Sequence, residues 1–193
     1  PVYDTDENIV LQVEEKIISA FSSCGQVRQA ARSRYLEMYP ESTGVDLSGV
    51  DWESVLKDNM AQLMELTPEY ITAQNIYTVA ALEETALQVL QESVVERTRA
   101  VLMEGLLVDD VADAAETIRT EFVEDDRFLI GEASLAYNIV QNNLEANRFY
   151  DKEATEQAKE EAAQSVEEVV YKKAQNIVRS GEIISEAQYQ LIK

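Results

Sequence analysis

The sequence predicts a mainly α-helical fold with a small β element (α+β): a helical bundle-like lobe plus a short C-terminal β-containing lobe near the termini. Two observations lead to this prediction. Over most of the chain, apolar residues recur three and four positions apart, which is the spacing of an amphipathic helix. In the last fifty residues, β-branched and aromatic residues interrupted by Ser180-Gly181 replace that pattern, and such residues favour strands.

The first predicted helix covers Asp6 to Phe21, because its apolar residues share one helical stripe: Val10, Val13, Ile17 and Phe21. The stretch from Tyr39 to Asp51 holds proline, glycine and small polar residues, so it is predicted to be a loop. A second helix is predicted from Trp52 to Leu66. Thr67-Pro68 then offers an N-cap followed by proline at the first helical position, which predicts that the next helix begins there.

The longest helix is predicted over Ala80 to Glu104, a segment rich in strong helix formers, with Gly105 as its stop. Asp109 or Asp110 is predicted to cap the next helix. The apolar stripe of that helix is Val111, Ala115, Ile118 and Phe122, and it ends in the acidic run 124–126. A further helix is predicted around Leu135, Ile139 and Val140, with its pattern loosening at residues 141–143.

The C-terminal region begins with a predicted helix from Glu156 to Gln164. A small strand element is expected next, from residues that include Val166, Val169, Val170, Tyr171, Ile177, Val178, Ile183 and Ile184. A final helix is predicted to open at Ser185, where Gln188 sits at the third position of a capping box.

The composition excludes several chemistries. The 193 residues include 37 acidic and 16 basic side chains, one cysteine and no histidine, and the net charge is −21. Without histidine the segment holds no Ser-His-Asp triad, no His-ligated zinc and no HD-type phosphohydrolase centre. A surface this acidic repels nucleic acids and anionic lipids. No apolar stretch is long enough to span a bilayer, and no cofactor motif is present.

Two acidic clusters invite a metal interpretation. Asp4, Asp6, Asn8 and Glu15 superficially follow the spacing of a calcium loop, but the position that needs glycine for the sharp turn is Ile9. Asp109, Asp110 and Asp113 lie close enough in sequence to share a metal ion. In both cases we favour carboxylates that stabilise a helix N-terminus.

Three arginines and the cysteine complete the candidates. Arg28, Arg32 and Arg34 form the basic cluster of the N-terminal half, and Arg28 and Arg32 fall on one helical face. They indicate either an anion site or pairing with carboxylates, and we favour pairing. Cys24 has no neighbouring His or Lys to activate it, so it is interpreted as a half-buried structural thiol.

The C-terminal fifty residues carry a more specific pattern: Asn147-Arg-Phe-Tyr-Asp151 with Thr155, Val166-Glu-Glu-Val169, then Gly181-Glu182 and Tyr189. This pattern resembles the end of the extracytoplasmic domain of bacterial seven-transmembrane HD hydrolases. Tyr3-Asp4 before an amphipathic helix is similar to the start of that domain. The chain departs from the family pattern at Ala146 and Glu168, where proline is common. The resemblance implies structural roles for the matching residues: Tyr3, Asp4, Asn147, Asp151, Thr155, Val166, Val169, Gly181, Glu182 and Tyr189.

The resemblance also implies a parent protein with membrane helices on both sides of this segment and a cytoplasmic HD domain that hydrolyses cyclic di-AMP. The segment itself is then a non-catalytic extracytoplasmic domain that recognises an extracytoplasmic ligand or an envelope protein. We expect one domain over residues 1–193, with a helical lobe over about 46–141 and a membrane-proximal lobe formed by 1–38 and 142–193. Residues near Tyr3 and near Leu191 are expected to emerge on the same side, with residues 2–4 against strands that contain Val169 or Ile183.

Two alternatives remain open at this point. The first is a free-standing helical chaperone-like or adaptor domain that accepts a partner helix or peptide in an apolar groove. The second is a carboxylate-based hydrolase, which requires two acidic groups facing each other across a cleft.

Overall fold

A computed structural model describes residues 1–42, 44, 46–165, 183 and 189. These residues form eight α-helices and one two-stranded antiparallel sheet, which confirms the mainly α fold with a small β element. The chain divides into two compact units, one made of Pro1 and Tyr3–Asp151 and the other of Val2 and Lys152–Lys193. The single domain with lobes of about 46–141 and of 1–38 with 142–193 stays a prediction from the sequence.

Helix α1 (Glu7–Met38) has 32 residues, so the longest helix is the first one and the prediction that it lies at Ala80 to Glu104 is wrong. Its N-cap is Asp6, whose carboxylate accepts a hydrogen bond from the N–H of Asn8 at 2.9 Å. The helix continues well past its predicted end at Phe21 because its buried stripe continues through Cys24, Val27 and Ala31. Packing outweighs the cost of about 1 kcal/mol for the glycine inside it, Gly25.

The sequence predicts a loop after α1, and the described residues of this segment include a 3-10 turn at Pro40–Ser42 and no α-helix. The predicted helix from Trp52 to Leu66 is two short helices, α2 (Trp52–Leu56) and α3 (Met60–Met64), separated by a turn. Trp52 is 3% exposed, and its indole N–H donates to the carbonyl of Leu47 at 3.2 Å. That contact holds the loop against the core.

Helix α4 (Ala73–Ala81) begins later than the sequence predicts. Thr72 and Asn75 form a reciprocal capping box at its start, so the prediction that Thr67-Pro68 begins this helix is wrong. In this box the side chain of each residue accepts a hydrogen bond from the backbone N–H of the other, so two N–H groups at the helix start gain partners. A threonine followed by proline provides fewer such hydrogen bonds. The chain then takes two extended residues, Leu82 and Glu83, before α5 (Glu84–Glu104) begins.

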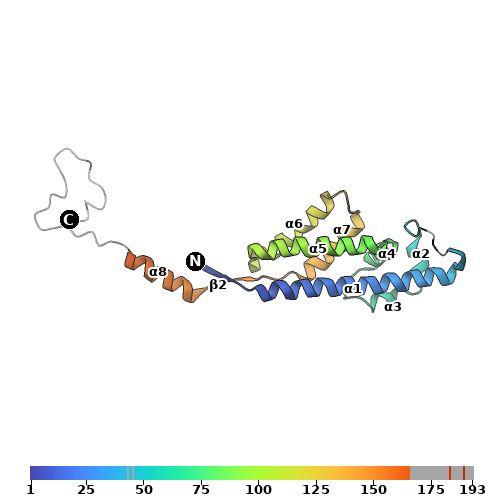
Figure 1. Ribbon diagram of the computed structural model, residues 1–193, viewed down its shortest axis with the longest axis horizontal. Coiled ribbons are helices and arrows are strands. Elements are labelled where there is room, and N and C mark those ends of the chain that lie inside the picture. Colours follow the sequence, from blue (N-terminus) through green and yellow to red (C-terminus); the bar gives the residue numbers. More distant parts are fainter. Residues whose placement is uncertain (43, 45, 166–182, 184–188, 190–193) are drawn as a thin grey trace, which may run out of the picture. The chain divides into compact units, whose positions relative to one another are not determined.

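Helices α6 (Val111–Glu124) and α7 (Ile130–Asn143) pair as a hairpin, and both lie where the sequence predicts helices. Asp110 occupies the N-cap position of α6 but makes no side-chain cap hydrogen bond there. The α7 helix runs through the asparagines that were expected to loosen it. Figure 1 shows α1 and α5 side by side, with α4, α6 and α7 completing the bundle.

The core lies between these helices, and its largest fully buried side chains come from nearly all of them: Phe21, Phe122, Ile17, Leu56, Ile71, Ile76, Leu90, Leu102, Ile118, Leu135, Ile139 and Val13. One ion pair crosses its edge. Glu14 on α1 accepts two hydrogen bonds from the guanidinium of Arg99 on α5, at 2.5 and 2.7 Å. Glu14 is 8% exposed, so this pair joins the two longest helices.

This pair predicts a pH dependence of stability. The hydrogen bond from Arg99 lowers the pKa of Glu14 from its ordinary value of 4.5, although partial burial opposes the shift. A carboxylate with a lower pKa in the folded state stabilises the fold above its unfolded-state pKa, and that contribution is lost as the pH falls through the folded pKa. We therefore expect the free energy of unfolding, measured by urea titration, to fall below about pH 4.5.

The Glu14→Gln variant isolates this contribution, because glutamine does not titrate. Its free energy of unfolding is expected to fall less steeply than that of the wild type below the ordinary glutamate pKa. The matched control is Glu15→Gln, which changes the next, exposed residue and leaves the Glu14–Arg99 pair in place. Identical acid profiles for Glu14→Gln and the wild type would contradict the assignment.

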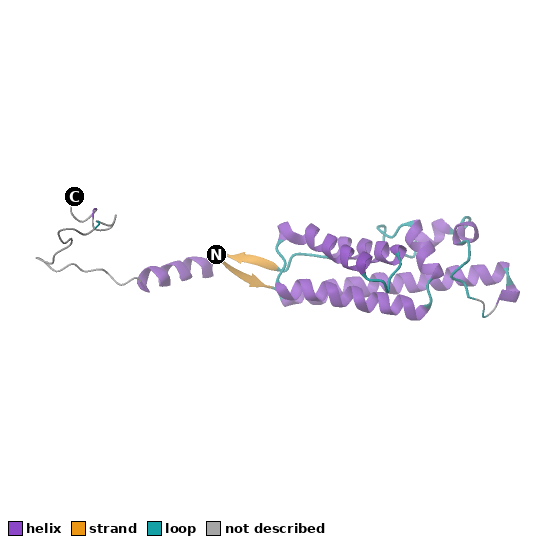
Figure 2. Ribbon diagram, turned by 90° about the horizontal axis from the view of Figure 1, so that it is seen from above, coloured by secondary structure: helices purple, strands orange, loops and turns teal. Residues whose placement is uncertain are grey.

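Strands β1 (Val2–Thr5) and β2 (Arg148–Asp151) pair with each other, and β1 leads directly into α1. Figure 2 shows the two strands side by side at the end of the bundle where α1 begins. Residues 2–4 thus pair with β2, a strand that the sequence analysis did not predict. Ile183 is 97% exposed, and Val169 lies outside the described residues.

Helix α8 (Lys152–Ser165) follows β2 and confirms the helix predicted at Glu156 to Gln164. Apart from Ile183, the residues of the expected strand element lie outside those that the structure describes, and so does the predicted opening of the last helix at Ser185. The expectation for the position of Leu191 also falls outside them.

Candidate functional site

The place where the chain enters and leaves the helical unit is organised around Asn147. We call β1, β2 and Asn147 the stem. Asn147 has no exposed surface, and both polar atoms of its side chain form hydrogen bonds: Oδ1 accepts from the N–H of Leu106 at 2.8 Å, and Nδ2 donates to the carbonyl of Leu102 at 2.8 Å. Its own carbonyl accepts from the N–H of Asp6 at 2.8 Å. One residue thus joins the end of α5 to the start of α1.

Gly105 makes this junction sterically feasible. It ends α5, as the sequence predicts, with a positive φ of 85° that favours glycine over residues with a Cβ. A Cβ at this position would lie 2.8 Å from Cδ of Arg148 and 3.4 Å from Oγ1 of Thr5. The absence of a side chain therefore lets both strands of the stem approach the end of α5 closely.

The stem carries an exposed aromatic cluster. The rings of Tyr3 and Tyr150 pack edge to face across the strands with centroids 6.0 Å apart, and the guanidinium of Arg148 lies 5.1 Å from the centroid of the Tyr3 ring. Cross-strand aromatic pairs and cation–π contacts each stabilise a strand pair modestly, by about 0.5 to 1 kcal/mol. Strands β1 and β2, which these exposed contacts hold together, can therefore separate more readily than the buried hydrogen bonds of Asn147 can break.

The remaining residues of the family pattern fall in several places. Asp4 is an exposed residue of β1 and accepts from the N–H of Thr5, and Asp151 ends β2. Within the second unit, the N–H of Val2 donates to Oγ1 of Thr155 at 2.8 Å. Tyr189 is 53% exposed. The other four lie outside the described residues: Val166, Val169, Gly181 and Glu182.

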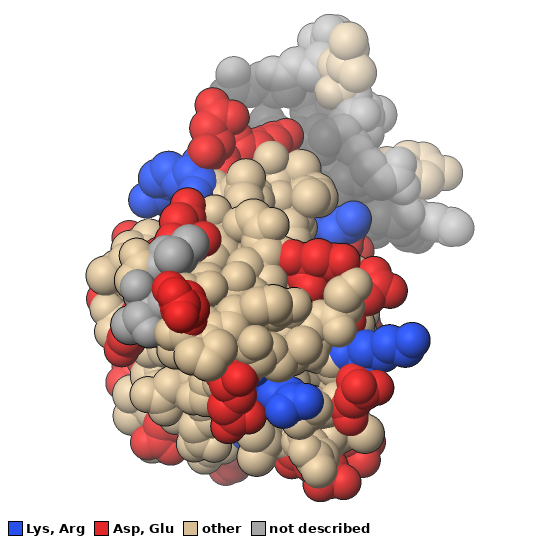
Figure 3. All heavy atoms as spheres, turned by 90° about the vertical axis from the view of Figure 1, so that its right-hand side faces the viewer, with Lys and Arg blue, Asp and Glu red and all other residues tan. Residues whose placement is uncertain are grey.

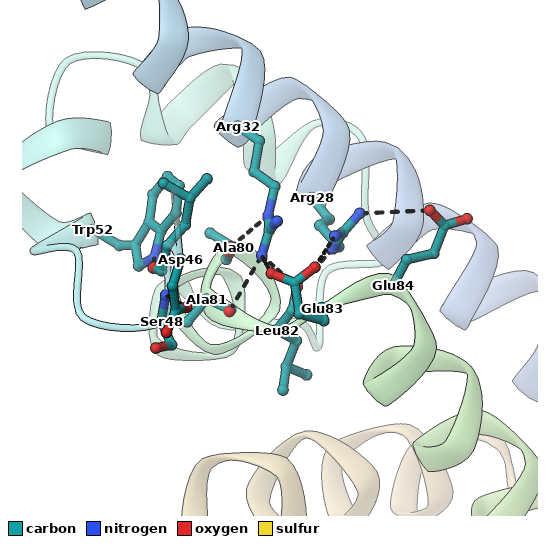
Figure 4. A network of polar contacts seen from close by, with 11 residues as sticks. Arg28, Arg32, Asp46, Ser48, Trp52, Ala80, Ala81, Leu82, Glu83 and Glu84 are labelled. Carbon is teal, nitrogen blue, oxygen red and sulfur yellow. Dashed lines mark hydrogen bonds and ion pairs between the residues drawn. The ribbon is translucent and has the colours of Figure 1, made fainter. Parts of the chain in front are cut away.

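The arginine cluster has a structural role. Nε of Arg28 donates to the carbonyl of Leu82 at 2.6 Å, and Nη2 of Arg32 donates to the same carbonyl at 2.8 Å and to Glu83 at 3.0 Å. Figure 4 shows both guanidinium groups directed at this segment between α4 and α5. Arg32 also donates to the carbonyls of Ala80 and Ala81, the last two residues of α4, and carbonyls at a helix end have no partner within the helix. This explains why the predicted helix over Ala80 to Glu104 is interrupted.

The carboxylate pairing predicted for these arginines is confirmed, with Arg28 next to Glu83 and Glu84 and Arg34 next to Glu37. Cys24 is fully buried rather than half-buried, because α1 is covered by other helices along this stretch. Burial raises the pKa of its thiol to about 12, so the group stays protonated and unreactive at neutral pH.

No group of three or more Cys, Asp or Glu in the described ranges is placed to hold one metal ion. Asp6 instead caps α1, in agreement with the capping interpretation of the first acidic cluster. On the face of the molecule shown in Figure 3, carboxylates are spread widely around uncharged surface, with few cationic groups. The negative charge of this face therefore agrees in sign with the net charge of −21.

A shallow groove of about 590 Å³ lies beside α1, on the half of the helix that follows the stem. Its walls come from α1, from the turn before α4 and from the end of α7: Gln12, Lys16, Ser19, Pro68, Tyr70 and Asn143 among them. The sequence analysis did not identify this groove. The sequence indicates the groove only indirectly, through the polar residues at 141–143, which interrupt the apolar pattern at the end of α7.

The fold and the stem together define a helical domain whose two chain connections meet at one junction. Comparison with known families assigns it: the family model of the 7TM-HD extracellular domain, 7TMR-HDED, matches residues 1–193, and the chain belongs to this family. The domain therefore lies on the extracytoplasmic side of a membrane protein. No helix of the described segments is long and apolar enough to cross a bilayer. Comparisons with curated proteins and with solved structures gave no match.

Proposed function

We propose that this domain is the non-catalytic receiver of a membrane-anchored HD-domain phosphodiesterase that hydrolyses cyclic di-AMP in the cytoplasm. The domain recognises an extracytoplasmic ligand or envelope protein and passes a conformational bias to the membrane helices that flank it. The family assignment favours this function over the free-standing adaptor. The HD centre uses histidine, and the chain contains none, so bond cleavage belongs to another part of the parent protein.

The observation that carries the proposal is the pairing of β1 with β2. The first strand of the helical unit and its last strand lie side by side, and Asn147 ties both to α1 and α5. A rearrangement of these helices therefore acts on both chain connections at one place. A ligand drives such a change only if it binds one of two conformations more tightly.

A cross-link across the stem tests this coupling. We expect a disulfide between cysteines introduced at the facing positions, Tyr3→Cys with Tyr150→Cys, to hold the strands together in the full-length membrane protein. Reconstituted in vesicles, the oxidised protein should hydrolyse cyclic di-AMP at a rate at least threefold different from that of its reduced form. The reason is that the locked stem restricts the two-state equilibrium to one of its conformations.

Each single-cysteine variant serves as a control, since it experiences the same oxidant without forming the intramolecular bridge. Cys24 is buried and its thiol is protonated, so it does not compete for the cross-link. Equal hydrolysis rates before and after reduction of the double variant would rule out signalling through the stem.

A further inference from the structure

The turn between α6 and α7 exposes apolar side chains. Leu129 is 73% exposed and Ile130 is 75% exposed, the two highest fractions among the described large apolar residues within 1–165. Val123, near the end of α6, is 50% exposed. We call Val123, Leu129 and Ile130 the apolar tip, and Figure 1 shows this turn at the edge of the helical unit. Exposed apolar side chains that gather at one place, rather than singly, are typical of interaction sites.

The rules of helix capping do not explain Leu129. It occupies the N-cap of α7, where serine, threonine, asparagine and aspartate are favoured because their side-chain oxygens accept from free N–H groups. A leucine side chain cannot accept such a bond. The N–H of Leu129 itself donates to the carboxylate of Glu132 at 2.6 Å, so only half of a capping box is formed. An apolar residue that breaks a local rule without a gain inside the fold is expected at a functional site.

The apolar tip stands on a firmly packed helix start. Gly131 directly follows the tip, and a Cβ at this position would lie 2.7 Å from Oγ1 of Thr78 on α4. The first turn of α7 therefore approaches α4 more closely than a residue with a side chain allows. Ala133, two positions further on, is 1% exposed. A partner thus meets a preformed surface, which lowers the entropy cost of binding.

A groove of about 440 Å³ lies between α6 and α7 and includes part of the apolar tip. Its lining residues come from both helices: Arg119 and Val123 from α6, and Ile130, Ala133, Ser134 and Tyr137 from α7. These positions follow one another at helical spacing, so the groove runs along the two helices. An extended peptide pairs with a free strand edge, whereas an amphipathic helix packs into a groove between side chains. The groove is therefore suited to a helix.

The charge around the apolar tip indicates what kind of helix fits. Residues 111–132 include seven acidic and two basic side chains. Both arginines already pair with carboxylates of the same hairpin: Arg119 with Glu116, and Arg127 with Asp125. The cation that lines the groove is thus neutralised locally. Three exposed carboxylates of the hairpin take part in no ion pair between described residues: Asp113, Glu124 and Asp126.

We propose that the apolar tip and this groove bind a basic amphipathic helix of an extracytoplasmic partner protein. Apolar residues three and four positions apart on the partner cover the tip, and its Lys or Arg residues face the unpaired carboxylates. A second copy of this chain would bring the same acidic hairpin against the first, and anionic lipids are repelled in the same way. A polyamine carries positive charge but no side chains that could cover the tip.

The α7 helix connects this site to the stem. Ile130 of the apolar tip is the first residue of α7, and the helix ends at Asn143, four positions before Asn147. A partner that docks along α7 and prefers one of two conformations biases the segment that carries the buried Asn147. The partner is then the envelope protein recognised by the domain, and this link to signalling rests on the proposed function.

The experiment titrates the 193-residue chain with the peptide acetyl-LKKLLKLLKKLLKL-amide and follows binding by NMR. The leucines of this peptide lie on one helical face and its lysines beside them. We expect saturable binding, with amide shifts concentrated at residues 116–137. The same peptide with glutamate in place of every lysine should not bind, because its charge has the same sign as that of the hairpin.

Leu129→Ser tests the apolar tip. Serine removes the exposed apolar side chain and supplies an N-cap oxygen, so the urea midpoint of this variant should not fall below that of the wild type. Its affinity for the lysine peptide should be at least fivefold weaker. Leu11→Ser is the matched control, since Leu11 is 60% exposed on α1 and does not line the groove. Its affinity should stay within twofold of the wild type.

A second pair of variants separates the local charge from the net charge of the chain. Glu124→Gln combined with Asp126→Asn removes two unpaired carboxylates near the apolar tip and should weaken the affinity at least threefold. Glu65→Gln combined with Glu69→Gln removes two exposed carboxylates before α4. Because both double variants change the net charge equally, we expect a clearly smaller effect from the second.

Four results would overturn the proposal. The first is the absence of saturable binding to the wild-type chain, and the second is equal affinity of Leu129→Ser and the wild type. The third is an equal effect of the two double variants, which would indicate attraction to the net charge alone. The fourth is a dimer of the free chain in sedimentation that Leu129→Ser abolishes, which would assign the tip to a second copy. The stem cross-link is measured without peptide, so its result stays independent.

Discussion

Replacing Asn147 with alanine is expected to destabilise the chain by about 3 kcal/mol, since each buried polar group left without a partner costs about 1 to 3 kcal/mol. The variant removes both hydrogen bonds of the side-chain amide, at 2.8 Å each. It leaves the N–H of Leu106 unpaired in the core, and the carbonyl of Leu102 keeps only its hydrogen bond from the N–H of Gly105. No water replaces them readily, because Asn147 has no exposed surface and Leu102 none either. Urea unfolding followed by circular dichroism measures the loss as a lower midpoint.

The matched control is Asn142→Ala. Asn142 is also an asparagine near the end of α7, but it is exposed, and its amide donates only to a carbonyl within its own helix, that of Asn138. We expect a change within about 0.5 kcal/mol for this exposed position. Comparable midpoints for the two variants would show that Asn147 does not anchor the stem. Asn147→Asp is a second test, because it keeps the acceptor for Leu106 and loses the donor to Leu102.

Replacing Phe122 with alanine is expected to cost about 4 kcal/mol, within the range of 3 to 5 kcal/mol for such truncations in cores. Phe122 is fully buried, and its ring centroid lies 5.0 Å from that of Phe128. The guanidinium of Arg97 lies 4.1 Å from the ring centroid, and its Nη1 has no hydrogen-bond partner among the described residues. Truncation therefore opens a cavity and also removes the ring against which a largely buried cation is placed.

Val123→Ala is the control for this prediction, since the next residue of α6 is 50% exposed and its truncation should change stability by less than about 0.5 kcal/mol. Thermal unfolding of both variants and the wild type gives the comparison. A difference below 1 kcal/mol between the two variants would mean that the α6–α7 hairpin repacks around the missing ring. Arg97 also pairs with Asp125 at 2.5 Å, so that pair persists in both variants.

Asp125 illustrates how this hairpin is fastened. It accepts hydrogen bonds from Arg127 and from Arg97, and these contacts hold the pKa of its carboxyl well below its usual range, with Arg127 making the larger contribution. The sequence analysis treated the acidic run 124–126 only as the end of a helix, which it is. The pairing with an arginine of α5 depends on a contact between segments far apart in the chain.

Local sequence signals identified several features correctly. Asp6 caps α1, and Gly105 ends α5. The predicted stripe of Val111, Ala115, Ile118 and Phe122 lies on a single helix, α6, and the last three of these residues are buried. The resemblance of the C-terminal residues to one family was confirmed by the match over residues 1–193. Caps, stops and apolar stripes depend on residues within one or two helical turns, and for this reason the sequence is sufficient to reveal them.

The features that the sequence did not reveal all require distant partners. The break between α4 and α5 depends on Arg28 and Arg32, about 50 positions earlier. The pairing of β1 with β2 and the role of Asn147 join residues at opposite ends of the helical unit, and the groove beside α1 needs three separate elements. Composition and local pattern thus determined a helical, acidic, histidine-free domain. Only the tertiary structure decided which polar groups meet, because their pairing is set by helix packing rather than by spacing along the chain.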